Sequence, residues 1–127
     1  MKIYTSYFAK IKNMPENIIP ITICGQAPKG YNGKQFRVLA PTYDIFKQYK
    51  QTGDSELYTQ RFYNERLNKL NALDIYKRLE ILSEGKDIAL ICYEKPSDFC
   101  HRHLVADWLN KELNINVEEF KERWRMC

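Results

Sequence analysis

The feature that most constrains the fold is a run of five consecutive apolar residues, Ile88 to Cys92. A strand with one solvated face alternates apolar and polar residues, whereas an unbroken apolar run of this length is typical of a strand covered on both faces. Such strands occupy the middle of parallel sheets, where helices provide the crossover connections. The run therefore predicts a largely parallel sheet with residues 88–92 at its centre.

Other segments predict the remaining strands. Alternating β-branched and aromatic residues over 2–9 indicate a strand at the start of the chain. A short apolar run over 18–24 indicates a second strand, which ends in a glycine-containing loop. Residues 36–39 and 115–120 are expected to form two further short strands.

Four segments show apolar residues at helical spacing and are expected to form helices: 41–51, 54–70, 72–83 and 99–113. The second of these begins with Asp54 as its N-cap. Gly53 and Gly85 are expected to end the first and third helices. Strands separated by helices predict an α/β fold: a single layered domain over residues 1–127, its largely parallel sheet flanked by helices.

Length and composition exclude several classes of protein. A chain of 127 residues with 44% hydrophobic content has the size of one globular domain and is not disordered. It has no apolar run long enough to cross a bilayer and no secretory leader pattern, so we expect a cytoplasmic protein with no membrane partner. The net charge of +4 is only weak support for a nucleic-acid partner.

The four cysteines are expected to be reduced thiols, since no secretory signal precedes them. They are Cys24, Cys92, Cys100 and Cys127. Cys24 and Cys92 lie in predicted strands, where a buried thiol packs as a small hydrophobe. Cys92, Cys100, His101 and His103 are close in sequence, but seven residues separate the two cysteines, unlike the spacing of zinc knuckles. We therefore expect no bound metal and no cofactor.

The segment that carries candidate chemistry follows the central strand. Glu94 lies in the turn after this strand, and Cys100, His101 and Arg102 begin the next predicted helix. Ligands of open α/β sheets gather at the carboxyl ends of the strands, where helix N-termini present free N–H groups. This segment is therefore the candidate site.

Helical geometry assigns a direction to each of these side chains. At 100° per residue, His101 falls on the buried face with Cys100 at its edge, Arg102 lies on the flank and His103 points away. The helix N-terminus favours a thiolate at Cys100 and a neutral His101.

We therefore consider Cys100 as a nucleophile, His101 as a general base oriented by Glu94, and Arg102 as a binding group for an anion. Glu94, His101 and Arg102 are expected to share a water-accessible hollow. The alternative is a purely structural strand-to-helix joint with the same contacts.

The loop after the second strand is a candidate wall of the site. Cys24 and Gly25 stand at its start and are candidate ligand-binding residues. Its three glycines match neither the Walker nor the dinucleotide spacing, so the loop can equally be an ordinary irregular connection.

The run from Leu90 to Pro96, followed by Cys100-His101-Arg102 and residues 104–109, resembles the signature of domain-of-unknown-function family 488, the YeaO-like proteins. Residues 39–44 are similar to a short, phage or Gram-positive-type branch. The resemblance implies a compact α/β domain whose marked polar residues correspond to Glu94, Cys100, His101 and Arg102, and it implies no established reaction. Longer members carry an Asp-Val-Arg block that is missing after residues 18–24, where Arg37 or Asp44 could substitute.

Three hypotheses follow. The leading one is a small enzyme or ligand-binding domain for an anionic, nucleotide-like small molecule. The second is a noncatalytic nucleic-acid-binding protein that uses basic side chains of the predicted helices: Lys47, Lys50, Arg61, Arg66, Lys69, Lys77 and Arg78. The third is a thiol redox sensor that pairs Cys100 with Cys24 or Cys92.

Overall fold

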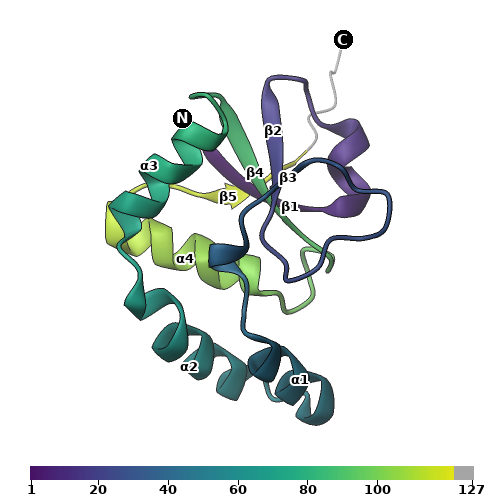
Figure 1. Ribbon diagram of the computed structural model, residues 1–127, viewed down its shortest axis with the longest axis vertical. Coiled ribbons are helices and arrows are strands. Elements are labelled where there is room, and N and C mark those ends of the chain that lie inside the picture. Colours follow the sequence, from purple (N-terminus) through teal and green to yellow (C-terminus); the bar gives the residue numbers. More distant parts are fainter. Residues whose placement is uncertain (122–127) are drawn as a thin grey trace.

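The computed structural model describes residues 1–121 and confirms the α/β prediction (Figure 1). Five strands, all parallel, form one sheet in the order β3-β2-β4-β1-β5. The strands are β1 (Ile3–Tyr7), β2 (Ile18–Thr22), β3 (Lys34–Gln35), β4 (Asp87–Cys92) and β5 (Glu118–Glu119).

In the described part of the chain, four α-helices and three short 3₁₀ helices connect the strands. The α-helices are α1 (Tyr43–Thr52), α2 (Ser55–Glu65), α3 (Ala72–Leu82) and α4 (His101–Leu113). The 3₁₀ helices are η1 (Phe8–Asn13), η2 (Arg37–Leu39) and η3 (Leu67–Lys69).

Strand β4 lies at the centre of the sheet, as its apolar run predicts. It pairs with β1 on one side and β2 on the other, so that Leu90 is level with both Thr5 and Ile21. Residues 88–92 of β4 are all buried. Because side chains of a strand alternate between faces, this burial shows that both faces of the sheet are covered at its centre.

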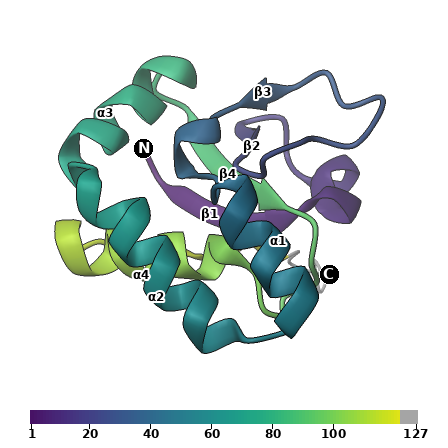
Figure 2. The ribbon, with the colours of Figure 1, turned by 60° about the horizontal axis from the view of Figure 1, so that its bottom comes forward.

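The two faces have different covers (Figure 2). All four α-helices pack on the face that carries Ile21, Ile88 and Leu90. The other face, with Ala89 and Ile91, packs against the first 3₁₀ helix, η1, and its surroundings. The connection from β1 to β2 crosses the sheet in one direction, and those from β3 to β4 and from β4 to β5 cross in the other. Because crossovers between parallel strands share one hand, connections that run in opposite directions along the sheet must lie on its opposite faces.

The predicted N-cap of the second helix is confirmed, and the first helix is capped in the same way. Thr42 accepts a hydrogen bond from the Ile45 backbone N–H at the start of α1, and Asp54 accepts one from the Leu57 N–H at the start of α2. Gly53 ends α1 with a φ of 67°, in the left-handed region that glycine adopts without strain.

Two sequence predictions about the elements were wrong. Residues 36–39 form a turn and η2 rather than a strand, and the short strand β3 lies just before them. Helix α2 ends at Glu65 rather than continuing to residue 70. Both differences involve Arg66, which leaves helical geometry and donates hydrogen bonds to the carbonyls of Arg37, Val38 and Ala40.

Within residues 1–121, none of the helices has the length and apolar character that a bilayer crossing requires. Cys127, the fourth predicted thiol, lies outside the described residues. The three described cysteines are free and buried, and Cys24, Cys92 and Cys100 pack together with Phe8.

Candidate functional site

The candidate residues lie at the carboxyl ends of β1 and β4. These neighbouring strands send their connections to opposite faces of the sheet, so a topological switch point lies between them, where open α/β sheets bind ligands. Cys92 is the last residue of β4, level with Tyr7 at the end of β1. Cys100 is the N-cap of α4, and His101 is its first residue.

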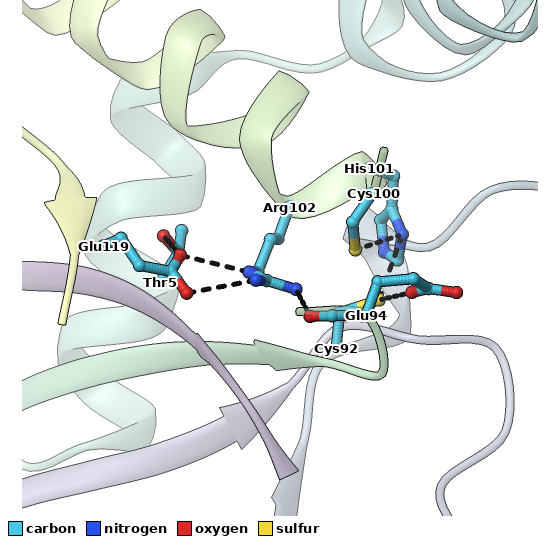
Figure 3. A network of polar contacts seen from close by, with 7 residues as sticks. All are labelled: Thr5, Cys92, Glu94, Cys100, His101, Arg102 and Glu119. Carbon is cyan, nitrogen blue, oxygen red and sulfur yellow. Dashed lines mark hydrogen bonds and ion pairs between the residues drawn. The ribbon is translucent and has the colours of Figure 1, made fainter. Parts of the chain in front are cut away.

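Two thiols and one imidazole meet at this point (Figure 3). The Cys92 Sγ lies 3.5 Å from His101 Nδ1, and the Cys100 Sγ lies 4.0 Å from the same nitrogen. Glu94 joins the group through Oε2, which is 3.7 Å from the Cys92 Sγ. The expected buried orientation of His101 is thus confirmed, with 5% of the residue exposed.

A backbone carbonyl fixes the protonation pattern of the His101 ring. Nε2 lies 2.7 Å from the carbonyl oxygen of Ile23, just beyond β2, and since that oxygen can only accept, Nε2 carries the hydrogen. In the neutral ring, Nδ1 then presents a lone pair to the two sulfurs. Edge-on packing against Phe62, with ring centroids 5.7 Å apart, further restricts the ring.

The two thiols have opposite acidities. A hydrogen bond from the Cys92 thiol holds the pKa of Cys100 well below its usual range. His101 acts in the same direction, because its Nδ1 takes up the Cys100 proton and then donates a hydrogen bond to the thiolate, although burial opposes both effects. The same contact, together with burial, raises the pKa of Cys92. The predicted acidification of Cys100 is confirmed, but its main cause is a second thiol rather than the helix N-terminus.

The expected flank position of Arg102 was wrong, because Arg102 is fully buried and points away from the thiols (Figure 3). Its Nε and Nη2 donate to the two carboxylate oxygens of Glu119 at 3.2 and 3.0 Å, and Nη1 donates to the backbone carbonyl of Glu94 at 2.6 Å. The Thr5 hydroxyl also donates to Glu119. Arg102 therefore links α4, β5 and the turn after β4, and its ligand-binding role stays a prediction.

Within residues 1–121, Glu94, His101 and Arg102 do not form the expected shared open hollow. Cys100 is 3% exposed and Arg102 faces Glu119, so only Glu94, which is half-buried, connects the cluster to the surface. Phe8 covers the thiols from outside, and its ring contacts those of Tyr31 and Tyr93 at centroid distances of 5.5 and 4.9 Å.

The loop after β2 does lie beside the site. Cys24 packs with the other two thiols, its Sγ 2.9 Å from the Thr22 hydroxyl, and burial raises its pKa. The Gln26 carbonyl accepts a hydrogen bond of 2.6 Å from the Tyr93 hydroxyl, which joins this loop to the turn after β4. Gly25, which lies between Cys24 and Gln26, is exposed, and a Cβ added to it would meet no other atom.

A shallow surface hollow of about 460 Å³ lies beside α2 and Phe99. It is lined by residues of α2 and by the residue before Cys100: Ser55, Glu56, Thr59, Gln60 and Phe99. The Glu56 carboxylate makes this hollow unsuitable for an anionic group.

Four of the seven basic residues in the nucleic-acid hypothesis make contacts within the protein, among them Lys50, whose Nζ lies 5.4 Å from the centre of the Phe46 ring. Arg61 pairs with Glu65 on α2 at 2.6 Å, and Arg66 binds backbone carbonyls. The Arg78 guanidinium lies 5.1 Å from the centre of the Phe36 ring. These arginines are at least partly committed to the fold, which leaves mainly exposed lysines for a phosphate backbone.

Two residues of the site were missed by sequence reasoning. Cys92 was considered as a packed hydrophobe, as a zinc ligand and as a redox partner of Cys100, but it was left out of the candidate site, although its place at the end of the central strand marked it in the same way as Glu94. Glu119 carried no signal, because its approach to Arg102 depends on β5 pairing with β1. His103, by contrast, does not join the group of Cys92, Cys100 and His101, as predicted.

The comparisons with known proteins identify one family. A family model, DUF488-N3a, described as "Active DUF488-N3 subclade", matches residues 4–113. The matched range includes the whole cluster from Cys92 to His101 and ends before Glu119. No curated protein and no solved structure matches the chain.

Proposed function

This chain belongs to the DUF488 family, and from that premise we propose that it is a small enzyme whose nucleophile is Cys100 and whose substrate is an anionic, nucleotide-like small molecule. The observation that carries the proposal is the meeting of Cys100, Cys92 and His101 at the switch point of the sheet. The word "active" in the family description also favours catalysis. The YeaO-like assignment and the branch suggested by residues 39–44 stay predictions.

Each side chain has a role in this mechanism. The Cys100 thiolate, stabilised by a hydrogen bond from the Cys92 thiol, attacks an electrophilic centre of the substrate; the bond from that centre to the leaving group breaks, and the leaving group departs with a proton from His101. His101 receives or returns a proton at Nδ1, because Nε2 is held by the Ile23 carbonyl. Glu94 connects the buried thiols with solvent, since its carboxylate contacts Cys92 and is partly exposed.

The anionic part of the substrate needs a positive environment that Arg102 does not supply while it is paired with Glu119. The N-terminus of α4 offers backbone N–H groups and a partial positive charge next to Cys100. Lys29 and Lys95 are exposed and lie two residues from Tyr31 and Tyr93 in the sequence. Gly25 leaves room for a ligand between the two loops, and Cys24 forms the inner wall.

Substrate entry requires displacement of the aromatic cover formed by Phe8, Tyr31 and Tyr93. The Tyr93–Gln26 hydrogen bond is one of the contacts that close it. The proposal also requires reduced thiols, which fits the reducing conditions of the cytoplasm.

Two alkylating probes test this function without knowledge of the substrate. Iodoacetamide should modify Cys100 faster than Cys24 and Cys92, as measured by mass spectrometry of peptides over time. His101→Ala should slow this reaction on the order of tenfold, because the thiolate loses its neighbouring ring. The rate of alkylation by the anionic probe iodoacetate, divided by the rate with iodoacetamide, should be higher for Cys100 than for the thiol of free glutathione. The proposed positive charge at the entrance attracts the anionic probe.

Charge-reversal variants locate the anion site. Lys29→Glu and Lys95→Glu should lower the iodoacetate-to-iodoacetamide ratio, whereas Lys86→Glu, exposed at the opposite end of β4, should not. Equal reactivity of all three cysteines would remove Cys100 as a nucleophile. If the iodoacetate-to-iodoacetamide rate ratio of Cys100 equalled that of glutathione, the result would refute the anionic substrate but not the role of Cys100 as nucleophile.

A further inference from the structure

The ligand atoms of Cys92, Cys100 and His101 already lie near the positions that a small metal ion requires. The two Sγ atoms and Nδ1 are all within 4.8 Å of one another, with sulfur-to-nitrogen distances of 3.5 and 4.0 Å. In a tetrahedral zinc site, the bond lengths place sulfur and nitrogen ligands about 3.6 Å apart and two sulfurs about 3.8 Å apart. Only small shifts of these side chains would therefore centre an ion between them.

The His101 ring is also held as a metal ligand usually is. Metal-binding histidines donate their second ring N–H to a carbonyl or carboxylate, which fixes the ring and directs the other nitrogen to the metal. Here Nε2 donates to the Ile23 carbonyl at 2.7 Å, and Nδ1 faces the two sulfurs. This arrangement exists in the chain without any ion.

Glu94 offers a fourth ligand. Its Oε2 lies 3.7 Å from the Cys92 Sγ (Figure 3) but outside the group of three ligand atoms, so the Glu94 side chain must move toward them to bind the ion. Carboxylate oxygens bind zinc, and two sulfurs with one imidazole select a thiophilic ion over Mg²⁺ or Ca²⁺.

We propose that Cys92, Cys100 and His101, with Glu94 as the fourth ligand, form a site for Zn²⁺. The ion replaces the proton of Cys92, which is released to solvent, and binds both sulfurs as thiolates. This differs from the expectation drawn from sequence spacing, because the seven residues between the two cysteines form a loop that returns α4 to the end of β4. With both sulfurs on the metal, Cys100 cannot attack a substrate, so zinc inhibits the enzyme; this last step rests on the proposed function.

Cobalt is the probe for metal binding, because thiolate ligands give Co²⁺ intense charge-transfer absorption. Titration of the reduced, metal-free protein with Co²⁺ should produce this absorption with one equivalent bound, and Zn²⁺ should displace it. Cys92→Ser, Cys100→Ser and His101→Ala should each weaken binding about a hundredfold or more, and Glu94→Gln about tenfold. Circular dichroism checks that each variant is folded.

Cys24→Ser is the matched control, since Cys24 packs in the same cluster but its Sγ contacts Thr22. It should bind Co²⁺ as the unchanged protein does, and so should Cys127→Ser. Loss of the absorption in Cys24→Ser, or its persistence in Cys92→Ser, would overturn the assignment of ligands. Absence of charge-transfer absorption in the unchanged protein would overturn the site itself.

A measurement on the unchanged protein covers the case in which the variants do not fold. Zinc K-edge X-ray absorption should show two sulfur neighbours at about 2.3 Å and lighter atoms at about 2.0–2.1 Å. A shell of oxygen and nitrogen alone would contradict the proposal.

Alkylation then separates this proposal from the proposed function. One equivalent of Zn²⁺ should suppress alkylation of Cys100 at least about tenfold, and chelation should restore it. Metal binding to a protein without a selectively reactive cysteine would refute the nucleophile alone. A reactive Cys100 that Zn²⁺ does not protect would refute the metal site alone.

Discussion

The Arg102 side chain carries its charge into a part of the molecule without solvent contact, where three acceptors compensate it. Two are the oxygens of the Glu119 carboxylate, and the third is the Glu94 carbonyl. The same arginine lies over the Tyr7 ring, 5.7 Å from its centre. Arg102 thereby fixes the backbone of Glu94, which in turn places the Glu94 side chain beside Cys92. Its influence on the cluster is one of positioning.

Removal of one member of this pair should be costly. Arg102→Ala leaves the Glu119 carboxylate largely buried without its partner, and we expect a loss of about 3–5 kcal/mol in the free energy of unfolding. Urea denaturation followed by circular dichroism measures it. Arg61→Ala is the matched control: its ion pair with Glu65 lies on the surface of α2, so a much smaller loss is expected. Equal losses in the free energy of unfolding would show that the buried Arg102–Glu119 pair stabilises the protein no more than the surface pair does.

At the scale of elements, η1 gives the site its cover, because this 3₁₀ helix begins with Phe8. The Phe8 ring packs on the three thiols from the face opposite the α-helices and meets the rings of Tyr31 and Tyr93. The cover therefore combines the ends of β1 and β4 with the loop after β2.

Phe8→Ala should open this cover. We expect alkylation of Cys100 by iodoacetamide to accelerate on the order of tenfold, because less side-chain movement is needed to expose the thiolate. Phe46→Ala, which changes an exposed ring on α1, should leave the rate unchanged. If Phe8→Ala accelerated all cysteines equally, the effect would be global loosening, and Phe8 would not be a specific cover.

Elements with local signals were predicted well from sequence. The apolar run of β4 and the capping residues Thr42 and Asp54 act within a few positions of the chain, so their patterns identify their structures. The turn to η2 and the early end of α2 had no such signal, because Arg66 joins two segments that are distant in sequence.

The residues of the site divide in the same way, into those with a local sequence signal and those placed by contacts between distant segments. His101 and Cys100 were placed correctly from helical spacing, whereas Arg102 was misplaced because its partner Glu119 is brought close only by the order of strands in the sheet. The meeting of Cys92 with Cys100 likewise depends on the path of residues 93–99, which periodicity does not describe.

At the scale of the whole molecule, one apolar cluster joins the sheet to all four α-helices. Its buried members include Ile45 of α1, Phe62 of α2, Leu79 of α3 and Leu109 of α4. A chain whose elements share one core is expected to unfold in a single step.

Pulsed hydrogen exchange across a urea series tests the predicted single domain. Amides of α2 and of β4 should lose protection at the same urea concentration, because both elements pack in the same cluster. Earlier loss throughout α1 and α2, with the sheet still protected, would divide the chain into two folding units. Far-UV circular dichroism on the same samples reports the overall transition.

The strand order also determines when the fold can form during synthesis. Strand β1 is made before the other strands of the sheet, yet both of its neighbours, β4 and β5, belong to the last third of the described residues. Pairing across such long separations carries a large loop-closure cost, so the nascent chain holds β1 unpaired until residues 87–92 have been made. Cys92, Cys100 and Arg102 are made before Glu119, so the guanidinium of the nascent chain lacks its carboxylate partner until β5 has emerged from the ribosome.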